Sequence, residues 1–473
     1  MSVNKLAVDM TPEQQLAHFV AGLSIDQIPD SARKTVRLMV LTNAGTAIAG
    51  ASQDGIEELR ALLMEAGGRP QATLLVYGDK LPAVAAAQFN ATMCRALDFC
   101  DAMAPGPHFG AALIPVAMAA AELRGGCSGN DFVAAIAAGV ELGARLNLSE
   151  SQYDGFDPTG VIVVLAAAAT ASRMLQLTPA QTLNALGLAM NRCGGSFQSH
   201  VDGSLAVRIV QGWVAQAGLQ CAQMALRNIS GPENFLTGHY GYAHLYGRNR
   251  LDIGACLDQL GKQWQLQSVM FKPYPSCGAT QGLTRLLLNL ITDKHIDAQH
   301  VDMVEIRLPP YSHKLVGHPF SVGPNLRVDA QFCAAWCAAN ALVRREVRLA
   351  HFEPDAVTDA QILAVARRVV VLPDADLTAR GHSAVDVTVT MQDGSRFQRG
   401  LDTAPGFPDA PLTDDEHCAR YEDCLSYAPY PMAESSESRL PEIIEYLEHM
   451  SDIRELISVL VRAEGLGGQR FEA

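Results

Sequence analysis

Aromatic and charged side chains are both scarce in this chain of 473 residues. Phe, Trp and Tyr make 6% of the residues and Asp, Glu, Lys and Arg make 18%, whereas 48% are hydrophobic. Small apolar side chains therefore supply much of the core, and this composition favours closely packed helices. A chain of this length exceeds one ordinary hydrophobic core, so we expect two domains.

No apolar run is long enough to cross a membrane. The most apolar span, residues 161–171, is ended by Arg173, and a transmembrane helix needs about 20 residues. Lys5, Asp9 and Glu13 interrupt the stretch where a secretion signal would be apolar. We therefore expect no membrane partner, and the net charge of −14 argues against nucleic acid as a partner.

The motifs that usually hold metals and cofactors are missing. The sequence contains no Cys-x-x-Cys, no His-Glu-x-x-His, no phosphate-binding Gly-rich loop and no dinucleotide fingerprint. We therefore predict a protein without metal or cofactor. Its 11 cysteines form an odd number without regular spacing, which is typical of a reduced, cytoplasmic protein.

Helical patterns dominate the first half of the chain. Thr11 and Pro12 supply a cap and the first position of a helix. Apolar residues at helical spacing follow, and the pattern returns after residue 412. We therefore predict a mainly α protein with a large all-α helical domain, formed by residues 1–268 and 405–473.

Strand patterns lie between these two helical parts. Residues 304–308 alternate apolar and charged side chains, which indicates a half-buried strand. A second alternating run, 385–390, leads into Asp393-Gly394, the strongest short signal for a hairpin. Helical segments separate the strands. We predict a smaller α+β domain at residues 269–404, inserted into the helical domain.

A loop between two Ala-rich helical runs concentrates reactive side chains. Asp98, Asp101 and His108 lie close together in sequence, and Pro105 and Pro107 prevent a continuous helix through them. Loops held between rigid helices often carry catalytic side chains. The same residues would equally well end one helix and cap the next, so local sequence leaves both interpretations open.

This loop resembles a segment of the MmgE/PrpD family. The family includes 2-methylcitrate dehydratase, cis-aconitate decarboxylase and iminodisuccinate epimerase, and its members carry a similar acidic run followed by His. The resemblance implies that Asp98 and His108 are catalytic and that Asp101 contacts substrate. Ala102 departs from the pattern, because dehydratases and decarboxylases have Thr there.

A second segment, Lys272-Pro-Tyr274-Pro-Ser-Cys277, is held extended by its prolines. Taken alone, it would be only a linker. It resembles the Lys-Pro-Tyr-Pro-x-Cys motif of the same family, although Gln281 stands where that motif usually ends in His. The resemblance implies that Lys272 and Cys277 are catalytic and that Tyr274 and Gln281 contact substrate.

Two further segments match the family in part. Arg208 matches the Arg of a Lys-Arg pair, whereas Val207 replaces the Lys. An Arg near a helix start can bind a carboxylate in bidentate geometry, and a surface Arg is an equally good interpretation. Asp157-Pro-Thr159 replaces the His-Pro-Thr that is common in the family.

The resemblance implies a small di- or tricarboxylate as the substrate. Family members share removal of a proton or carboxylate beside a carboxylate, which needs an acid or base and cations. His108 is the natural acid or base, Asp98 can orient it, and Lys272 and Arg208 are candidate carboxylate clamps.

The departures from the family pattern favour one reaction. Ala102, Val207, Cys277 and Gln281 occupy positions that the family associates with dehydration and decarboxylation. Inverting a stereocentre needs only deprotonation and reprotonation. Our first prediction is therefore an epimerase of an amino- or imino-dicarboxylate such as iminodisuccinate. A 2-methylcitrate-type dehydratase, a cis-aconitate-type decarboxylase and a non-catalytic carboxylate-binding protein are the alternatives.

The sequence also predicts a homodimer. The Ala-rich runs 111–123 and 161–171 carry little charge and exceed what one small bundle easily covers. We expect them to form a large helical interface, which the family resemblance also implies.

Overall fold

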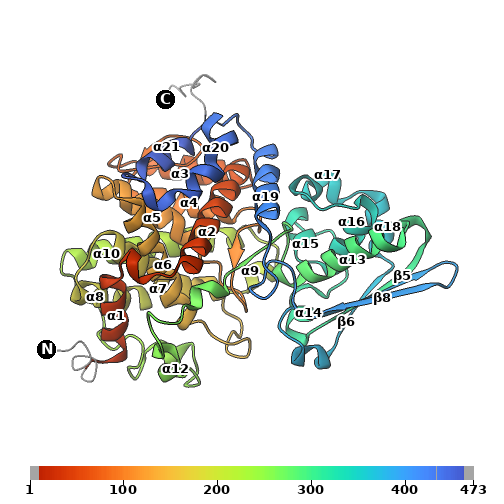
Figure 1. Cartoon of the computed structure of the whole chain (residues 1–473), viewed down its shortest axis with the longest axis horizontal. Helices are drawn as coiled ribbons and strands as arrows, with labels where there is room; N and C mark the ends of the chain where they lie inside the picture. Colours follow the sequence, from red (N-terminus) through yellow and green to blue (C-terminus); the bar gives the residue numbers. More distant parts are fainter. Residues whose placement is uncertain (1–9, 433, 463–473) are drawn as a thin grey trace.

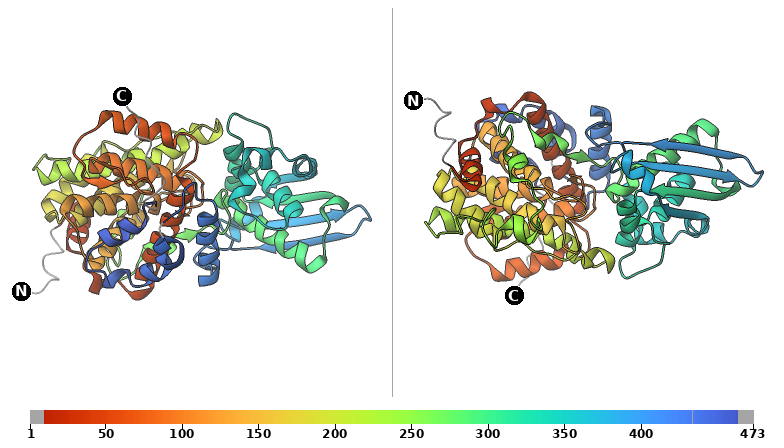
Figure 2. Two further views of the ribbon diagram at one scale, coloured as in Figure 1. Left: turned by 90° about the horizontal axis from the view of Figure 1, so that it is seen from above. Right: turned by 90° about the horizontal axis from the view of Figure 1, so that it is seen from below.

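A helical bundle and a smaller sheet domain lie side by side along the longest axis of the molecule (Figures 1 and 2). This computed structural model describes residues 10–432 and 434–462. The prediction of a mainly α fold with a small α+β domain is confirmed. No helix in the described ranges is long and apolar enough to cross a membrane.

Local capping explains several helix starts in the bundle. Thr11 accepts from the backbone N–H of Gln14, with Pro12 at the first helical position, and Thr178 caps a later helix in the same way. The long helices of this part are α1 (Pro12–Gly22), α2 (Asp30–Gly50), α3 (Ile56–Ala66), α4 (Ala83–Arg95), α5 (Gly110–Arg124), α6 (Gly129–Arg145), α7 (Val164–Met174), α8 (Pro179–Met190) and α10 (Ala206–Leu226). The short helices α9 (Gln198–Val201), α11 (Tyr242–Leu245) and α12 (Ile253–Leu257), and a small hairpin of β1 (Ala72–Thr73) and β2 (Lys80–Leu81), complete it.

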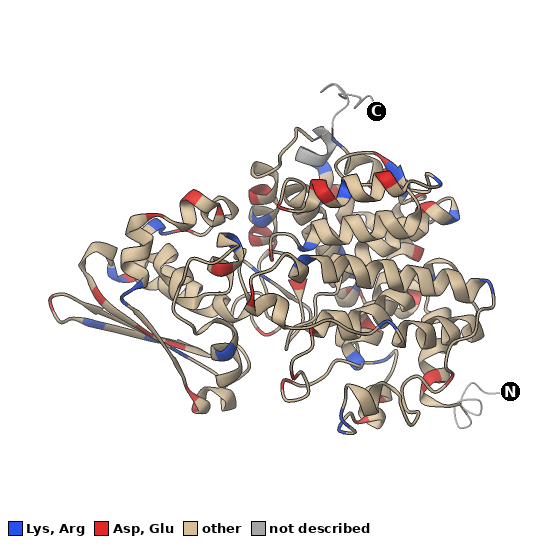
Figure 3. Cartoon of the chain, turned by 180° about the vertical axis from the view of Figure 1, so that it is seen from behind, with Lys and Arg blue, Asp and Glu red and all other residues tan. Residues whose placement is uncertain are grey.

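Small residues let the central helices approach closely. A Cβ added to Gly212 of α10 would lie 2.2 Å from Thr92 Oγ1 of α4, and one added to Gly139 of α6 would lie 1.9 Å from Thr170 Oγ1 of α7. Figure 3 shows few charged residues on these central helices. The Ala-rich runs in α5 and α7 are buried within their own chain. Our reason for predicting a homodimer, that these helices need a partner to cover them, was therefore wrong.

The smaller domain contains a four-stranded sheet with the order β6-β5-β7-β8. Its strands are β5 (Val301–Leu308), β6 (Val369–Pro373), β7 (Val385–Met391) and β8 (Arg396–Leu401). The predicted strand at 304–308 and the hairpin at Asp393-Gly394 are confirmed, with β7 antiparallel to β5 and β8. Strand β6 pairs parallel to β5 and was not predicted. Its run of three valines does not alternate with polar residues, so the sequence carried no period of two.

Helices cover one face of this sheet (Figure 1). Helices α13 (Gln281–Lys294), α14 (Pro310–Val316) and α16 (Ala334–Arg344) contact the strands. The other helices of this domain are α15 (Leu326–Gln331), α17 (Pro354–Val357) and α18 (Ala360–Ala366). Their apolar sides form a second core with the buried strand residues, around the fully buried Trp336. This core is separate from that of the bundle.

The chain then returns to the bundle through α19 (Asp414–Ser426), which lies at the junction of the two domains (Figure 1). Helices α20 (Glu434–Glu445) and α21 (Arg454–Val459) follow. A short two-stranded ladder of β3 (Asp101–Ala102) and β4 (Met270–Phe271) also lies near this junction. It joins the two segments that resemble the family, so the fold itself brings them together.

Candidate active site

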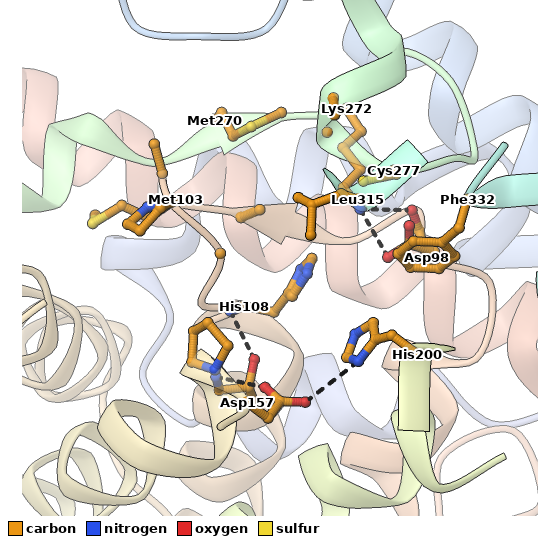
Figure 4. Close-up of a pocket in the computed structure, with 18 of the residues that line it drawn as sticks. Asp98, Met103, His108, Asp157, His200, Met270, Lys272, Cys277, Leu315 and Phe332 are labelled. Carbon is orange, nitrogen blue, oxygen red and sulfur yellow. Dashed lines mark hydrogen bonds and ion pairs between the residues drawn. The ribbon is translucent and has the colours of Figure 1, made fainter. Parts of the chain in front are cut away.

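A cavity lined by residues of both domains lies where the two domains meet. All four residues predicted to be catalytic, Asp98, His108, Lys272 and Cys277, line it. Figure 4 shows them around a common space.

Strands β3 and β4 place these side chains. Asp101 pairs with Phe271 and Ala102 pairs with Met270 in antiparallel register. Lys272 directly follows β4, and its Nζ atom lies 2.8 Å from Asp98 Oδ1 and 3.1 Å from the Asp98 carbonyl oxygen. The ladder thus joins the two motifs although 170 residues separate them in sequence.

Two side chains from other elements strengthen this junction. The Arg420 guanidinium of α19 donates to the carbonyl oxygens of Phe99, at 2.8 Å, and Lys272, at 2.5 Å. The Gln331 amide of α15 donates to the carbonyl oxygens of Leu97, at 2.6 Å, and Pro275, at 3.0 Å. Arg420 and Gln331 are therefore positioning residues that connect both motif backbones.

Asp98 is the centre of a buried charge cluster. Its Oδ1 atom accepts from both Arg95 Nη1 and Lys272 Nζ, and all three side chains are almost fully buried. Burial by itself raises the pKa of the Asp98 carboxyl, but the charges of Arg95 and Lys272 outweigh burial and hold that pKa below its ordinary range. The cluster therefore contains one carboxylate and two cations, with a net charge of about +1.

The ring of His108 is oriented by the backbone. Its Nδ1 atom lies 2.8 Å from the carbonyl oxygen of Asp101. Because a carbonyl oxygen only accepts, we assign the ring proton to Nδ1, which leaves Nε2 unprotonated. Burial, followed by the charges of Arg95 and Lys272, holds the pKa of His108 well below its ordinary value. The ring is therefore neutral at neutral pH and its free nitrogen can accept a proton.

A second imidazole, that of His200, also lines the cavity (Figure 4). It stacks on Phe197 with ring centroids 4.2 Å apart and meets Phe332 edge-on at 5.5 Å. Its Nδ1 atom lies 4.0 Å from Asp157 Oδ2. Asp157 is held by the backbone N–H of Thr159, at 2.8 Å, where a π-helical turn leads into α7.

Two weak acids also line the cavity, Cys277 and Tyr311. Burial raises the pKa of the Cys277 thiol to about 11, and the Asp98 charge adds to this effect. Burial also raises the pKa of Tyr311, whose hydroxyl donates to the carbonyl oxygen of Pro105 at 3.3 Å. Both groups therefore keep their protons at neutral pH.

Family profiles match both halves of the chain. The profile of the MmgE/PrpD N-terminal domain matches residues 14–252, and that of the MmgE/PrpD C-terminal domain matches residues 274–444. The chain belongs to the MmgE/PrpD family. The family prediction made from the two motifs is thus confirmed.

Individual relatives within the MmgE/PrpD family match along almost their whole length. The cis-aconitate decarboxylase-like protein oryM of Aspergillus oryzae is 24% identical, over 96% of this chain and 98% of its own. The cis-aconitate decarboxylase of Mus musculus is 22% identical, over 94% of this chain and 93% of its own. That of Aspergillus terreus is also 22% identical, over 94% and 95%. These names match our alternative, a lyase, and not the epimerase that we predicted first.

Arg208 does not line the cavity, contrary to our prediction. Val207 and Val210 of the same helix line it instead, because successive helical residues point about 100° apart. The Arg208 side chain is buried, and its Nη atoms have no hydrogen-bond partner among the described residues. Burial, with the nearby charge of Arg327, lowers its pKa to about 10.

The other three predicted substrate contacts also lie outside the cavity lining. Asp101 is fully buried and accepts from Asn43, at 2.7 Å, and from the backbone of Gly110, at 2.9 Å. Gln281 bonds to the backbone on both sides of the Tyr274–Cys277 turn. The Tyr274 hydroxyl accepts from Arg285 at 2.9 Å and faces a different surface cleft. These residues shape the loops that carry the site.

His200 and Arg95 were missed as site residues. Asp157 was noted as a departure from the MmgE/PrpD pattern, which has His there, and His200 places an imidazole near the same position. The available signal was a motif that had lost its His, with His200 following later in the same domain. Arg95 was quoted in the motif, but its pairing with Asp98 becomes evident only from the structure.

The described residues contain no group of three His, Cys, Asp or Glu side chains that could hold a metal ion. The absence of a metal or cofactor requirement stays a prediction.

Proposed function

We propose that this protein is a decarboxylase that acts on a small unsaturated carboxylic acid without a metal or organic cofactor. The observation that carries the proposal is the Arg95–Asp98–Lys272 cluster beside a neutral His108 in one buried cavity. The names of the relatives, cis-aconitate decarboxylases, support the same class of reaction.

Such a reaction breaks the carbon–carbon bond to one carboxylate and releases CO2. The electron pair of that bond forms a new double bond, and the π electrons of the existing double bond take up one proton at the far carbon. Negative charge develops beside the carboxylate that remains. A fixed cation there lowers the barrier, and Lys272 with Arg95 supplies it.

His108 is placed to deliver the proton. Two of the causes that lower its pKa are the charges of Arg95 and Lys272. A substrate carboxylate bound at these cations offsets their charge, so the pKa of His108 rises when substrate binds. Nε2 then takes up a proton from solvent and transfers it to carbon. Decarboxylation consumes one proton per turnover, which matches this role.

The same geometry gives less support to an epimerase. Epimerisation with two bases needs a second unprotonated group opposite His108. The Cys277 thiol has a pKa of about 11 and keeps its proton. The Nζ atom of Lys272 already donates to Asp98 Oδ1 at 2.8 Å. Neither candidate for the second base is therefore ready to accept a proton.

The test is an NMR assay in D2O with protein dialysed against EDTA. The panel contains cis-aconitate, 3-alkylglutaconates, 2-methylcitrate and iminodisuccinate. We expect release of CO2 and a product that is one carbon shorter, with one deuterium at the newly protonated carbon. The variant His108→Gln, which keeps a polar side chain but cannot carry the proton, is the control.

Other products would contradict the proposal. Loss of water from a hydroxy acid without CO2 would identify a dehydratase. Deuterium exchange at an unbroken carbon skeleton would identify an epimerase. Activity lost in EDTA and restored by one divalent metal would contradict the cofactor-free mechanism.

A further inference from the structure

We propose that the substrate is an unsaturated dicarboxylate that carries an apolar arm, rather than a tricarboxylate. This inference rests on the proposed decarboxylation and narrows its substrate class. Its basis is the distribution of charge and apolar surface around the cavity.

The charges that line the cavity are balanced. The only Lys or Arg side chains in the described lining are Arg95 and Lys272, and they are matched by Asp98 and Asp157. Both cations bond to the same oxygen, Oδ1 of Asp98. That cluster therefore has a net charge suited to one carboxylate.

The Asp157 carboxylate disfavours a third negative charge on the substrate. Asp157 is buried, with its Oδ2 atom 4.0 Å from His200 Nδ1. Besides His108, which carries the proton in the proposed reaction, His200 and His382 line the cavity, and their imidazoles are the partners left for a second substrate carboxylate. The Nδ1 atom of His382 is already paired with Glu150. A third carboxylate would be left against Asp157 or against apolar side chains, and an unpaired charge in a buried site is strongly unfavourable.

Apolar side chains form the remaining wall. Met103, Met270 and Leu315 lie on the side of the cavity away from Asp157 and His200 in Figure 4. Val207 adds a further apolar group from α10. Methionine side chains adapt to the shape of an apolar ligand, so this wall suits an alkyl arm in the place where a tricarboxylate has its third carboxylate.

The first test measures binding without turnover, by titration calorimetry on the full chain. The probes are tricarballylate and its analogues 3-methylglutarate and 3-propylglutarate, in which an alkyl group replaces the central carboxylate. We expect 3-propylglutarate to bind at least about tenfold more tightly than tricarballylate, with roughly a fourfold gain per added methylene. Tighter binding of tricarballylate would overturn the inference.

The second test adds a cation to the apolar wall. Leu315 is only half-buried, so Leu315→Lys can be accommodated, and Leu226→Lys on the exposed end of α10 is the matched control. We expect Leu315→Lys to shift the ratio of kcat/KM for cis-aconitate over 3-propylglutaconate upward by more than tenfold, and Leu226→Lys to leave it unchanged. An unchanged ratio in Leu315→Lys would contradict the inference.

The experiments can contradict the proposed decarboxylation and the proposed ligand class independently of each other. If no acid in the panel releases CO2 but the alkyl glutarates bind more tightly than tricarballylate, decarboxylation is wrong and the ligand class stands. If CO2 is released and cis-aconitate is the better substrate, decarboxylation stands and the ligand class is wrong.

Discussion

The chemistry of His108 depends on which ring nitrogen carries the proton. The Asp101 carbonyl oxygen lies 2.8 Å from Nδ1 and fixes the tautomer. Asp101 accepts from Asn43 through its side chain, at 2.7 Å, and pairs with Phe271 in the ladder. Asp101, which we predicted as a substrate contact, therefore orients the ring of His108 instead.

Replacing the His108 imidazole tests its role directly. We expect His108→Gln to lower kcat by roughly a hundredfold or more, the usual range for a lost acid–base group. KM should change little, because Arg95 and Lys272 remain to hold substrate. Steady-state kinetics measures both constants. A kcat within threefold of the unaltered protein would remove His108 from the mechanism.

Cys277 should be unreactive toward alkylating reagents. With a pKa of about 11, its thiolate fraction at pH 8 is about one thousandth, and the thiolate is the nucleophile. We expect iodoacetamide to label Cys277 at least about a hundredfold more slowly than free cysteine, as followed by peptide mass spectrometry. Rapid labelling at pH 8 would mean that Cys277 is available as a base, as an epimerase would require.

At the scale of elements, the site depends on the contact of α19 with two loops. Arg420 is buried and donates to the carbonyl oxygens of Phe99 and Lys272 and, at 3.0 Å, to Thr42 Oγ1. Without the guanidinium, these buried oxygens lose their partner. Such a loss costs free energy and loosens the loops that carry Asp98 and Lys272.

Arg420→Met should therefore impair both stability and catalysis. We expect the free energy of unfolding to fall by about 1–3 kcal/mol for each buried oxygen that loses its donor and kcat to fall by more than tenfold. Lys34→Met is the control. Lys34 of α2 pairs with Asp414 of α19, the helix that carries Arg420, but this pair is exposed. Thermal melts measure the stability of both variants, and steady-state kinetics measures their kcat. Unchanged kcat in a folded Arg420→Met protein would show that the loops hold their geometry without α19.

Elements with strong local patterns could be predicted from the sequence. The capped helices and the β7–β8 hairpin carry their signal in adjacent residues. The pairing of Asp98 with Lys272 could be expected only through the family resemblance, because it depends on a ladder between distant segments. His200 reaches the cavity from the four-residue helix α9, whose placement depends on packing against Phe197 and Phe332.

Some polar motif residues were assigned to substrate because sequence shows residue type and not direction. Gln281 and Tyr274 look like ligand contacts in a motif, yet Gln281 satisfies buried backbone groups and Tyr274 pairs with Arg285. Arg208 is one position away from Val207, which does line the cavity. Successive residues of a helix point about 100° apart, so one can line the cavity while the next is buried in the core.

For the whole molecule, buried histidines link stability to pH. The pKa values of His108, His200, His351 and His417 are lowered, chiefly by burial, and those of His351 and His417 to about 4. In the unfolded chain these residues bind protons below about pH 6.5, whereas in the folded protein they bind protons only at lower pH. The unfolded state is then favoured as pH falls.

We therefore expect the melting temperature to decrease from pH 7 to pH 5. His351 and His417 each contribute on the order of 1–2 kcal/mol over this interval. His417→Gln, which replaces a buried ring of α19 next to Phe271, should flatten the dependence. Differential scanning fluorimetry across this range measures it, and a melting temperature that rises toward pH 5 would contradict the assignment.

The homodimer stays a prediction, although α5 and α7 are covered within the chain. Large apolar side chains remain exposed elsewhere in the described bundle, among them Leu62, Val201, Trp213 and Tyr240. We expect light scattering at micromolar concentration to give twice the mass of the chain. If α10 is part of the interface, Trp213→Lys should lower that mass. A monomeric unaltered protein would refute the dimer.

The β3–β4 ladder also determines when the active site can form during synthesis of the chain. Asp101 leaves the ribosome long before Phe271, its ladder partner, and Arg420 follows later still. Contacts between such distant segments form slowly, because a long loop must close first. Until then the Asp98 carboxylate can pair with Arg95 but not with Lys272. A nascent chain therefore lacks a complete active site until both motifs and Arg420 of α19 have left the ribosome, so most of the chain must be made before chemistry can begin.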